Sequence, residues 1–428
     1  MALNTKMRMM LNSHLAERSK ATKASRIQAI ALTTMALLSG NVSAENALLD
    51  NISGYVSVEG RYFPNDPAFP KQSKTGGVSL SISPEYKYRT DDDNATFTFN
   101  PFYRWDDTDD NRSHGDIRQL DFVTAKGDWE FQVGIGRKFW GVTESQHLVD
   151  IINQKDGVEG ADSEDKLGQP MIRASKLTEN GSIDFYVLPY FRQRTFVGEE
   201  SRLRFALPVN TDATQYESTS EEKHIDYALR YSTSFDEYDM GLSYFMGTSR
   251  DPIFPNELIT PSSVTPFYPL IRQYGLDLQY TGESIIWKLE AIHRQPNSDQ
   301  SKFEKYSAAV GGFEYTLPTI SESGAELGIL AEYHLDSRGQ KPSVAFQKDL
   351  FVGARLALND EDSSELLAGA FVDLDNSTKS IRVEGSRRIG NGLKLNLEAQ
   401  VFTDVDSNDA LNSFSEDDHI KLELQKFF

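Results

Sequence analysis

The chain lacks cysteine and, beyond its N-terminal region, any long hydrophobic run. It has 428 residues, no cysteine and a formal net charge of −20. No later segment approaches the roughly 18 apolar residues that a membrane-spanning helix needs, which excludes a helical membrane protein. Without cysteine, disulfides cannot stabilise the fold in an oxidising compartment. The acidic balance also excludes the basic surface of a nucleic-acid-binding protein, so no nucleic-acid partner is expected.

The N-terminal region has the order of a secretion signal. Six basic residues, the last of them Arg26, precede an apolar stretch at 27–38, and Val42 and Ala44 then place small residues where a signal peptidase reads. We therefore expect residues 1–44 to be a signal peptide that is cleaved from the mature chain. A surface amphipathic helix is the alternative for this segment.

The stretch VSLSISPEYKYR (78–89) places apolar or aromatic residues at every even position and polar residues at every odd position. This period of two predicts an extended strand with one apolar and one polar face. Strands of soluble proteins usually have about five or six residues, whereas transmembrane strands need about nine to eleven. The pattern predicts that Val78 and Leu80 face lipid and that Ser79 faces a lumen.

Similar alternation recurs along the rest of the chain and predicts eighteen strands. The expected strands are 52–63, 78–89, 95–105, 116–125, 129–137, 169–177, 182–196, 223–232, 240–250, 270–280, 285–295, 306–317, 325–336, 349–358, 364–374, 380–388, 393–403 and 419–428. Short polar connections alternate with long ones, except at 375–379. This alternation is typical of outer-membrane barrels, and Greek-key sandwiches have no reason to show it. Residues 45–428 are therefore predicted to form an all-β fold, one transmembrane antiparallel barrel of about eighteen strands with short periplasmic turns and long extracellular loops.

The C-terminal sequence HIKLELQKFF resembles the assembly signal of Gram-negative outer-membrane β-barrels. Ile420, Leu422, Leu424 and Phe428 match this signal, whereas Lys426 departs from it because it falls on the expected lipid face. The resemblance implies a protein of the cell outer membrane that is surrounded by a lipid bilayer and lipopolysaccharide. It also implies that the barrel-assembly machinery recognises the last strand.

A second, shorter likeness concerns the stretch VGIGRKFWGVTESQHLVDIINQKD (133–156). This stretch resembles the eighteen-strand porins of the alginate-export kind, a group of channels. Within the same architecture, aromatic residues near strand ends are expected in the two interfacial girdles. The expected girdle residues are Tyr86, Tyr88, Tyr103, Trp105, Trp129, Tyr280, Trp287, Tyr306 and Tyr315.

Three prolines, Pro84, Pro101 and Pro189, lie inside predicted strands. A proline removes a hydrogen-bond donor from the ladder, so each predicts either a bulge or a strand that ends earlier.

The motifs that could carry catalytic or metal chemistry are incomplete. Glu144 and His147 form a single E-x-x-H without the second copy that a di-iron site requires. The loop that begins at Asp404 resembles a calcium loop but has Asp409 and Ser415 where glycine and glutamate are needed. No phosphate loop, zinc spacing or G-x-S-x-G occurs. We therefore expect no enzyme, cofactor or metal, although a Ser–His pair shared between two strands stays open as an outer-membrane hydrolase.

The wet face of the strands carries basic residues that are predicted to line the lumen. These residues are Arg61, Lys87, Arg89, Arg104, Arg192, Arg194 and Arg294. They are expected either to form a track for anionic solutes or to pair with acidic residues as part of the wall. Arg192 and Arg194 form the densest cluster. Segment 138–168 is the best candidate to fold inward and narrow the lumen, which eighteen strands would otherwise leave wide.

The sequence thus predicts a porin-like channel for passive diffusion or export of small or anionic solutes, with a polysaccharide as a further candidate. The alternatives are a surface barrel that does not conduct, such as a scaffold, adhesin or receptor, and the outer-membrane hydrolase.

Overall fold

A computed structural model describes residues 51–160, 164–339, 341 and 344–428, and the expected signal peptide at 1–44 lies outside these residues. In the described part, eighteen strands form one antiparallel sheet. They are β1 (Ile52–Tyr62), β2 (Gly76–Arg89), β3 (Ala95–Asp106), β4 (Gly115–Lys126), β5 (Trp129–Gly136), β6 (Gln169–Thr178), β7 (Gly181–Leu188), β9 (Asp226–Phe235), β10 (Tyr238–Thr248), β12 (Leu270–Thr281), β13 (Ile285–Pro296), β14 (Tyr306–Leu317), β15 (Glu326–Asp336), β16 (Asp349–Ala357), β17 (Glu365–Asp373), β18 (Lys379–Ile389), β19 (Leu393–Thr403) and β20 (His419–Phe427).

The sheet closes on itself because the last strand pairs with the first. β20 pairs antiparallel with β1 from Tyr55↔Phe427 to Tyr62↔Ile420. Phe428 completes the seam, since its N–H donates to the carbonyl of Gly54 at 3.0 Å and its carbonyl accepts from the N–H of Gly54 at 3.1 Å. A closed barrel leaves no unpaired sheet edge, which confirms the predicted architecture.

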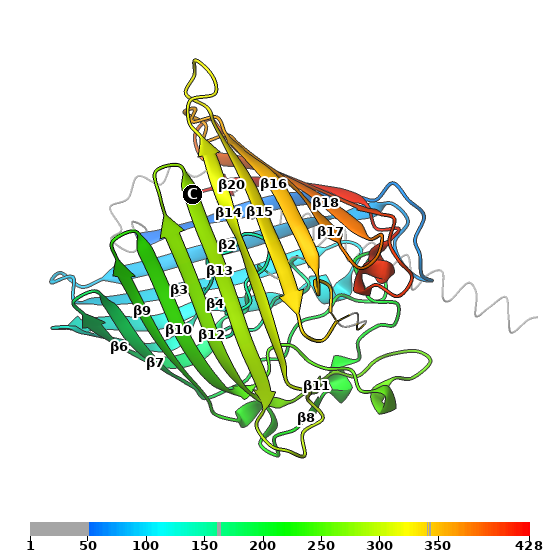
Figure 1. The fold of residues 1–428 in the computed structure, drawn as a ribbon, viewed down its shortest axis with the longest axis horizontal. Coiled ribbons are helices and arrows are strands. Elements are labelled where there is room, and N and C mark those ends of the chain that lie inside the picture. The colour runs from blue at the N-terminus through cyan, green and yellow to red at the C-terminus, as the bar shows by residue number, and fades with distance from the viewer. Residues whose placement is uncertain (1–50, 161–163, 340, 342–343) are drawn as a thin grey trace, which may run out of the picture. The chain divides into compact units, whose positions relative to one another are not determined.

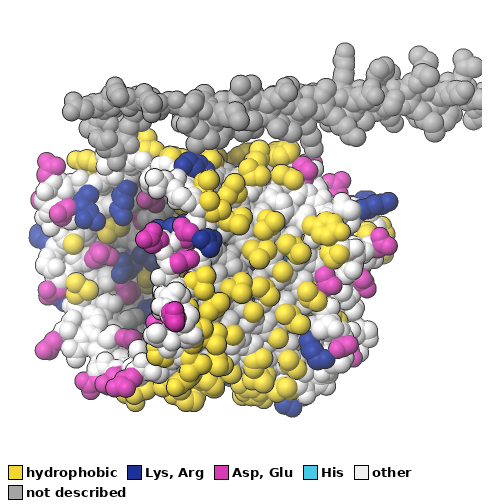
Figure 2. Space-filling view, turned by 90° about the horizontal axis from the view of Figure 1, so that it is seen from above, with side chains coloured by type: hydrophobic (Ala, Val, Ile, Leu, Met, Phe, Trp, Pro, Cys, Tyr) yellow, Lys and Arg dark blue, Asp and Glu magenta, His cyan; other side chains and the backbone are white. Residues whose placement is uncertain are grey.

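Side chains alternate between the outside and the inside of the barrel, as the period-two pattern predicts. Val58 is 52% exposed on the outside, while its neighbour Glu59 is only 4% exposed on the inside. Val78 and Ser79 divide in the same way, at 45% and 1%. Figure 2 shows hydrophobic side chains spread over the outer wall, with charged side chains gathered beside them around a hollow. The apolar outside and polar inside match a barrel that stands in lipid.

The connections gather by length at the two ends of the barrel (Figure 1). Most short turns lie at one end, here called the turn end, and the long connections lie at the other, the loop end, together with the short link 374–378 between β17 and β18. Two of the loops hold the two-residue strands β8 (Gln215–Tyr216) and β11 (Phe267–Tyr268), which pair in parallel with each other. The other elements in the long connections are short 3₁₀ turns. Within the described residues, no helix has the length and hydrophobicity needed to cross a membrane.

The prolines explain where the predicted strands are irregular. The pairing of β2 with β3 is interrupted around Pro84, and the register between β3 and β4 shifts at Pro101. The prediction of one strand over 182–196 is wrong at its end, because β7 stops at Leu188 and Pro189 has no N–H to continue the ladder. Every other predicted strand end lies within three residues of the observed one.

The aromatic girdles are confirmed with one exception. Tyr103, Trp129 and Tyr315 lie exposed on the outer wall near strand ends. Tyr306 is buried inside the barrel instead, because its ring packs against the Arg338 guanidinium at 3.8 Å. The out-of-place Lys426 is also explained, since its ammonium donates to the carbonyl of Asn391 at the turn end, 3.1 Å away.

Candidate functional site: a loop that crosses the lumen

The loop of residues 137–168, called the inner loop below, leaves β5 and enters the barrel. One part of it binds inward-facing carboxylates of β13 and β15. The Glu290 carboxylate accepts from the N–H groups of Val142 and Thr143, at 2.8 and 3.1 Å, and from the Thr143 hydroxyl at 2.7 Å. The Glu332 carboxylate accepts from the N–H groups of Glu144 and Ser145, both at 2.8 Å. Two strand carboxylates therefore hold the first half of the loop.

A later part of the inner loop binds the wall at β1 and β3. Glu159 accepts from Arg104 at 2.8 Å, and the Arg61 guanidinium donates to the Glu159 carbonyl at 2.9 Å. Arg104 also reaches Glu59, at 3.2 Å, and Glu59 accepts from Arg112 at 2.8 Å. These charges are almost fully buried, so the network satisfies groups that would be costly to bury alone.

These two sets of contacts place the inner loop across the lumen. Around the wall of eighteen strands, β3 is third and β13 is eleventh in order, which makes them almost opposite. A loop that contacts both must span the interior. This geometry confirms the prediction that segment 138–168 folds inward, and the described part of the segment contains no helix.

An apolar core lies inside the barrel where the inner loop meets the wall. Val149, Ile151 and Ile152 of the loop are at most 1% exposed and belong to one cluster with inward-facing residues of the surrounding strands. The inward-facing members are Met171, Tyr186, Leu188, Ala228, Phe245, Ile271, Ile292, Tyr306 and Ala308. The alternating pattern predicts polar side chains along the whole inner face, so this apolar part of the interior is a correction. It exists because the loop supplies an apolar face for these strands to bury.

The opposite part of the inner wall stays wet. On β18, β19 and β20, the side chains of Arg382, Glu398 and Lys421 are 26%, 17% and 21% exposed. The Glu290 side chain, on the dry side, is fully buried. The loop therefore fills the lumen unevenly and leaves an inner face of both charge signs along these three strands.

A basic pocket opens on the inner loop beside β5. It has a volume of about 320 Å³ and is lined by Arg137, Lys138, Phe139, Glu164, Asp165 and Lys166. Asp165 lies 3.7 Å from Arg118, and Lys166 pairs with Asp150 at 3.1 Å. Among the described residues, neither Arg137 nor Lys138 forms an ion pair.

Two further properties suit this pocket to a ligand. Burial, and then the positive charge of Arg173, hold the pKa of Lys138 below its usual range. An anion bound beside this ammonium would offset the free-energy cost of burying its positive charge. The Phe139 ring is 59% exposed, so it offers a flat apolar surface next to Arg137 and Lys138.

The predicted lumen residues fall into three groups. Arg61, Arg104 and Arg294 face inward but anchor loops, and Arg294 pairs with Asp251 of the loop 249–269 at 3.1 Å. Lys87 and Arg89 lie exposed near the turn end, where Arg89 is 3.7 Å from Asp93.

The third group, Arg192 and Arg194, follows the end of β7 and lies in a loop. Arg192 pairs with Asp116 at 2.6 Å and lines a hollow in the outer wall. The backbone N–H of Arg194 donates to the Tyr268 hydroxyl at 3.0 Å. Arg137 and Lys138 are not among the predicted lumen residues, since in the sequence they stand out only as part of the stretch 133–156 that resembles alginate-export-like porins. The signal that could have found them is a basic pair at the entrance of the segment predicted to fold inward.

Several loops are joined over the loop end by one arginine. Arg202, in the loop 189–225, is 1% exposed. It donates to the Asp417 carboxylate at 2.8 Å and to the carbonyls of Asn65 and Glu416, at 3.0 and 2.7 Å. Three loops that are far apart in sequence are therefore held together by a single guanidinium, here called the mouth clamp.

The structure contains a Ser–His contact between the inner loop and β15. The Ser145 hydroxyl lies 2.8 Å from His334 Nε2, but it also donates to the Glu332 carboxylate. Glu332 accepts from the Ser145 N–H as well. A hydrolase would need that hydroxyl as the attacking group and free N–H groups for the oxyanion. Here the hydroxyl and the N–H groups of Glu144 and Ser145 all donate to Glu332, so the arrangement anchors the loop.

The two remaining motifs also have structural contacts. Glu144 pairs with Arg355 at 2.7 Å, whereas His147 lies 3.9 Å from Glu290. Asp404 pairs with Lys379 at 2.7 Å. Within the described residues, no group of three or more potential ligands is placed to hold a metal ion.

Comparison with known proteins gives structural neighbours only. No protein-family model and no curated protein sequence matches the chain. Wzi of Escherichia coli, an outer-membrane protein involved in group 1 capsule assembly and a carbohydrate-binding β-barrel, is similar with a TM-score of 0.51, at 10% identity over 86% of this chain and 83% of Wzi. OccK11 (OpdR) of Pseudomonas aeruginosa is similar with a TM-score of 0.51, at 11% identity over 89% of this chain and 96% of OccK11.

These neighbours show that the chain has the fold of Gram-negative outer-membrane β-barrels. The narrower resemblance to alginate-export-like porins stays a prediction.

Proposed function

We propose that the protein is an outer-membrane channel for passive diffusion of small anionic solutes, narrowed by the inner loop. The observation that carries this proposal is the basic pocket on a loop that spans the lumen. An eighteen-strand wall leaves a wide aqueous interior, so selection needs something that reaches into it. The inner loop does so, and it presents Arg137 and Lys138, which form no ion pair within the described part of the chain although Glu164 and Asp165 line the same pocket.

Electrostatic reach explains why this position matters. At physiological salt an exposed charge is screened over about 8 Å. Charges on a wide wall would leave most of the lumen unaffected, whereas charges on a crossing loop act on every ion that passes. The basic pocket therefore favours anions despite the net charge of −20 of the whole chain.

The membrane setting rests on the outer wall and the last strand. The exposed Ile420, Leu422 and Leu424 continue the apolar outside of the barrel to its closing seam. We propose that this strand is what the barrel-assembly machinery recognises, with the bilayer and lipopolysaccharide around the wall.

The test is ion selectivity in a planar bilayer. Replacing both Arg137 and Lys138 with glutamine should shift the reversal potential toward cation selectivity, and more strongly at low salt. The matched control replaces Lys71 and Arg387 with glutamine. These changes remove the same charge from two exposed sites, where the partners are Glu199 and Asp362. The control should keep the native reversal potential. Equal reversal potentials for all three proteins would overturn the proposed role of the pocket.

A second candidate is a carbohydrate-binding surface barrel that does not conduct. The mouth clamp favours it, because it ties three loops over the end at which an external ligand would arrive. The structural neighbour Wzi is described as carbohydrate-binding, which adds support at the level of the fold. A refolded protein that inserts into bilayers without any conductance would favour this candidate over the channel.

A further inference from the structure

The hydrogen-bond ladder of the wall has a gap between β4 and β5 at the loop end. The pairing of these strands runs from the turn end to Leu120↔Ile135, and β5 ends one residue later at Gly136. Residues 115–119 of β4 therefore have no strand on this side.

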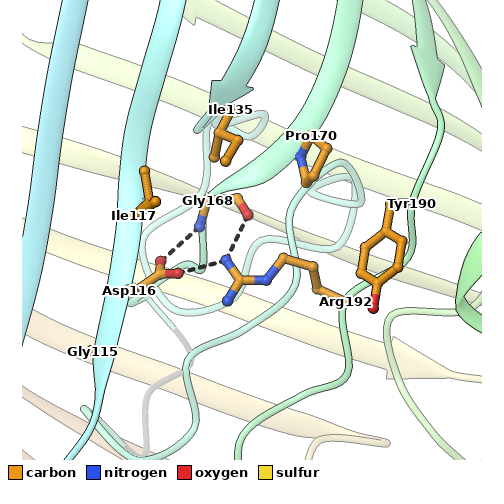
Figure 3. Close-up of a pocket in the computed structure, with 8 residues that line it drawn as sticks. All are labelled: Gly115, Asp116, Ile117, Ile135, Gly168, Pro170, Tyr190 and Arg192. Atoms are coloured by element: carbon orange, nitrogen blue, oxygen red, sulfur yellow. Dashed lines mark hydrogen bonds and ion pairs between the residues drawn. The ribbon is translucent and has the colours of Figure 1, made fainter.

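A clasp of three residues closes the inner side of this gap (Figure 3). The N–H of Gly168 donates to Asp116 Oδ2 at 2.9 Å. Arg192 Nη1 donates to Asp116 Oδ1 at 2.6 Å and to the Gly168 carbonyl at 2.7 Å. Position 168 needs glycine, because a Cβ there would come within 2.1 Å of the Ile117 carbonyl oxygen.

Outside the clasp the wall is hollowed by a notch of about 440 Å³. Ile117, Ile135 and Pro170 line it with apolar side chains, and Tyr190 and Arg192 border it. This volume lies within the range of pockets that hold small ligands, about 300–1,000 Å³. Because the lining continues the lipid-facing side of the wall, the ligand that reaches it most easily is a membrane lipid.

The level of the notch indicates which part of a lipid it meets. Gly115, at its rim, pairs with Tyr103, an outward girdle residue that is 47% exposed. Girdles mark the interface where chains and headgroups meet. Arg192 uses Nη1 for the clasp, and among the described residues no acceptor lies against its Nε or Nη2. The notch thus combines an apolar floor with guanidinium donors that are open to an anionic group.

We propose that the notch binds an acyl chain of a phosphorylated outer-leaflet lipid, whose phosphate accepts from Arg192. The acyl chain would cover Ile117, Ile135 and Pro170, beside the part of the wall in which β4 and β5 are no longer paired. The phosphate would meet donors that Asp116 leaves unused. This site depends on the membrane setting of the barrel but not on whether the lumen conducts.

The test measures retention of lipid A, a phosphorylated and acylated disaccharide, by the purified full-length barrel in detergent, using native mass spectrometry. Ile117→Trp should fill the notch and lower the affinity about tenfold, the equivalent of 1.4 kcal/mol. The control is Ile172→Trp, at a position that is 51% exposed on the same outer wall but outside the notch. It should retain lipid A as the native protein does. Equal retention by both variants would overturn the site.

The charge is tested separately. Arg192→Gln should lose lipid A, whereas Arg192→Lys, which keeps a cation and a donor, should recover part of it. Heat-modifiability of each variant shows that the barrel has folded, so that failed assembly is not read as lost binding. Retention of an uncharged diacylglycerol as strong as that of lipid A, or retention of a free fatty acid without lipid A, would overturn the assignment of the ligand. Loss of conductance would bear on the channel alone.

Discussion

The buried charged residues that join the inner loop to β1 and β3 are tolerated because they share several partners. Arg104 donates to Glu159, Glu59 and the Ser79 hydroxyl, the last at 2.6 Å. Removing one member of such a buried network costs about 3–5 kcal/mol, since the remaining charge loses its compensation. The network therefore fixes the position of the inner loop relative to the wall. This explains why inward-facing arginines that the sequence suggests as ion ligands act here as anchors.

On the wet side of the wall, neighbouring residues should differ sharply in their tolerance of charge. Leu397 on β19 faces outward and pairs with Leu422, whereas Asn396 faces inward beside Glu423, at 3.3 Å. Leu397→Arg should lower the free energy of unfolding by about 2–4 kcal/mol, because it places a cation in the bilayer. Asn396→Arg should change it little, since the new cation lies in water next to a carboxylate. Urea titrations of folding into lipid vesicles measure both, and similar losses would contradict the assigned faces.

At the scale of elements, the strands could be predicted from the sequence, whereas the contacts that fix the paths of the loops could not. A strand that separates lipid from water has to alternate over its whole length, so its residues carry the evidence locally. β19 was predicted with the observed bounds, 393–403. The inner loop takes its path from Glu290 and Glu332, which lie more than 100 residues further along the chain. Such contacts leave no local pattern.

The candidate site was predictable only in part for the same reason. Alternation gave the correct inward face for Arg61, Arg104 and Arg294 but could not show that loop carboxylates neutralise Arg104 and Arg294. Arg192 was misplaced because the extension of β7 past Pro189 assumed that the ladder continues. Whether a lumen arginine is free depends on tertiary partners, and these come from loops.

The inner loop itself is expected to set the size of the conduit. Deleting residues 142–149 and joining the ends with a Gly-Ser link should raise the single-channel conductance and weaken ion selectivity, because the deletion removes the contacts with Glu290 and Glu332. The control deletes the exposed segment 256–262 from a long loop and should leave conductance unchanged. Unchanged conductance after the first deletion, in a protein that still shows heat-modifiable folding, would mean that the inner loop does not narrow the path.

The whole molecule combines a rigid wall with an interior that is filled on one side. The apolar core occupies the side from β6 to β14, the inner loop crosses from there to β1 and β3, and the charged face on β18 to β20 remains wet. The mouth clamp lies over the loop end and joins segments from the beginning, middle and end of the described chain. Access from the loop end therefore depends on how firmly these loops are held. The clamp contains a buried carboxyl, so its closure should respond to pH.

Burial raises the pKa of Asp417 in the mouth clamp to about 6, and the neighbouring Arg202, His419 and Arg204 lower it by less. Once released into water, this carboxyl would titrate near 3.9. The closed clamp therefore binds the proton more tightly than the open one, so closure is favoured at acid pH and weakens as the pH rises from about 4 through about 6.

Amide hydrogen exchange of residues 198–206, corrected for the intrinsic pH dependence of exchange, should show protection that falls over this range. Asp417→Asn mimics the protonated carboxyl and should keep protection constant, whereas Asp212→Asn, an exposed change in the same loop, should behave as the native protein does. Protection that increases with pH in the native protein would show that the ion pair with Arg202 outweighs the cost of burying the carboxylate, and the mouth would then close at neutral pH.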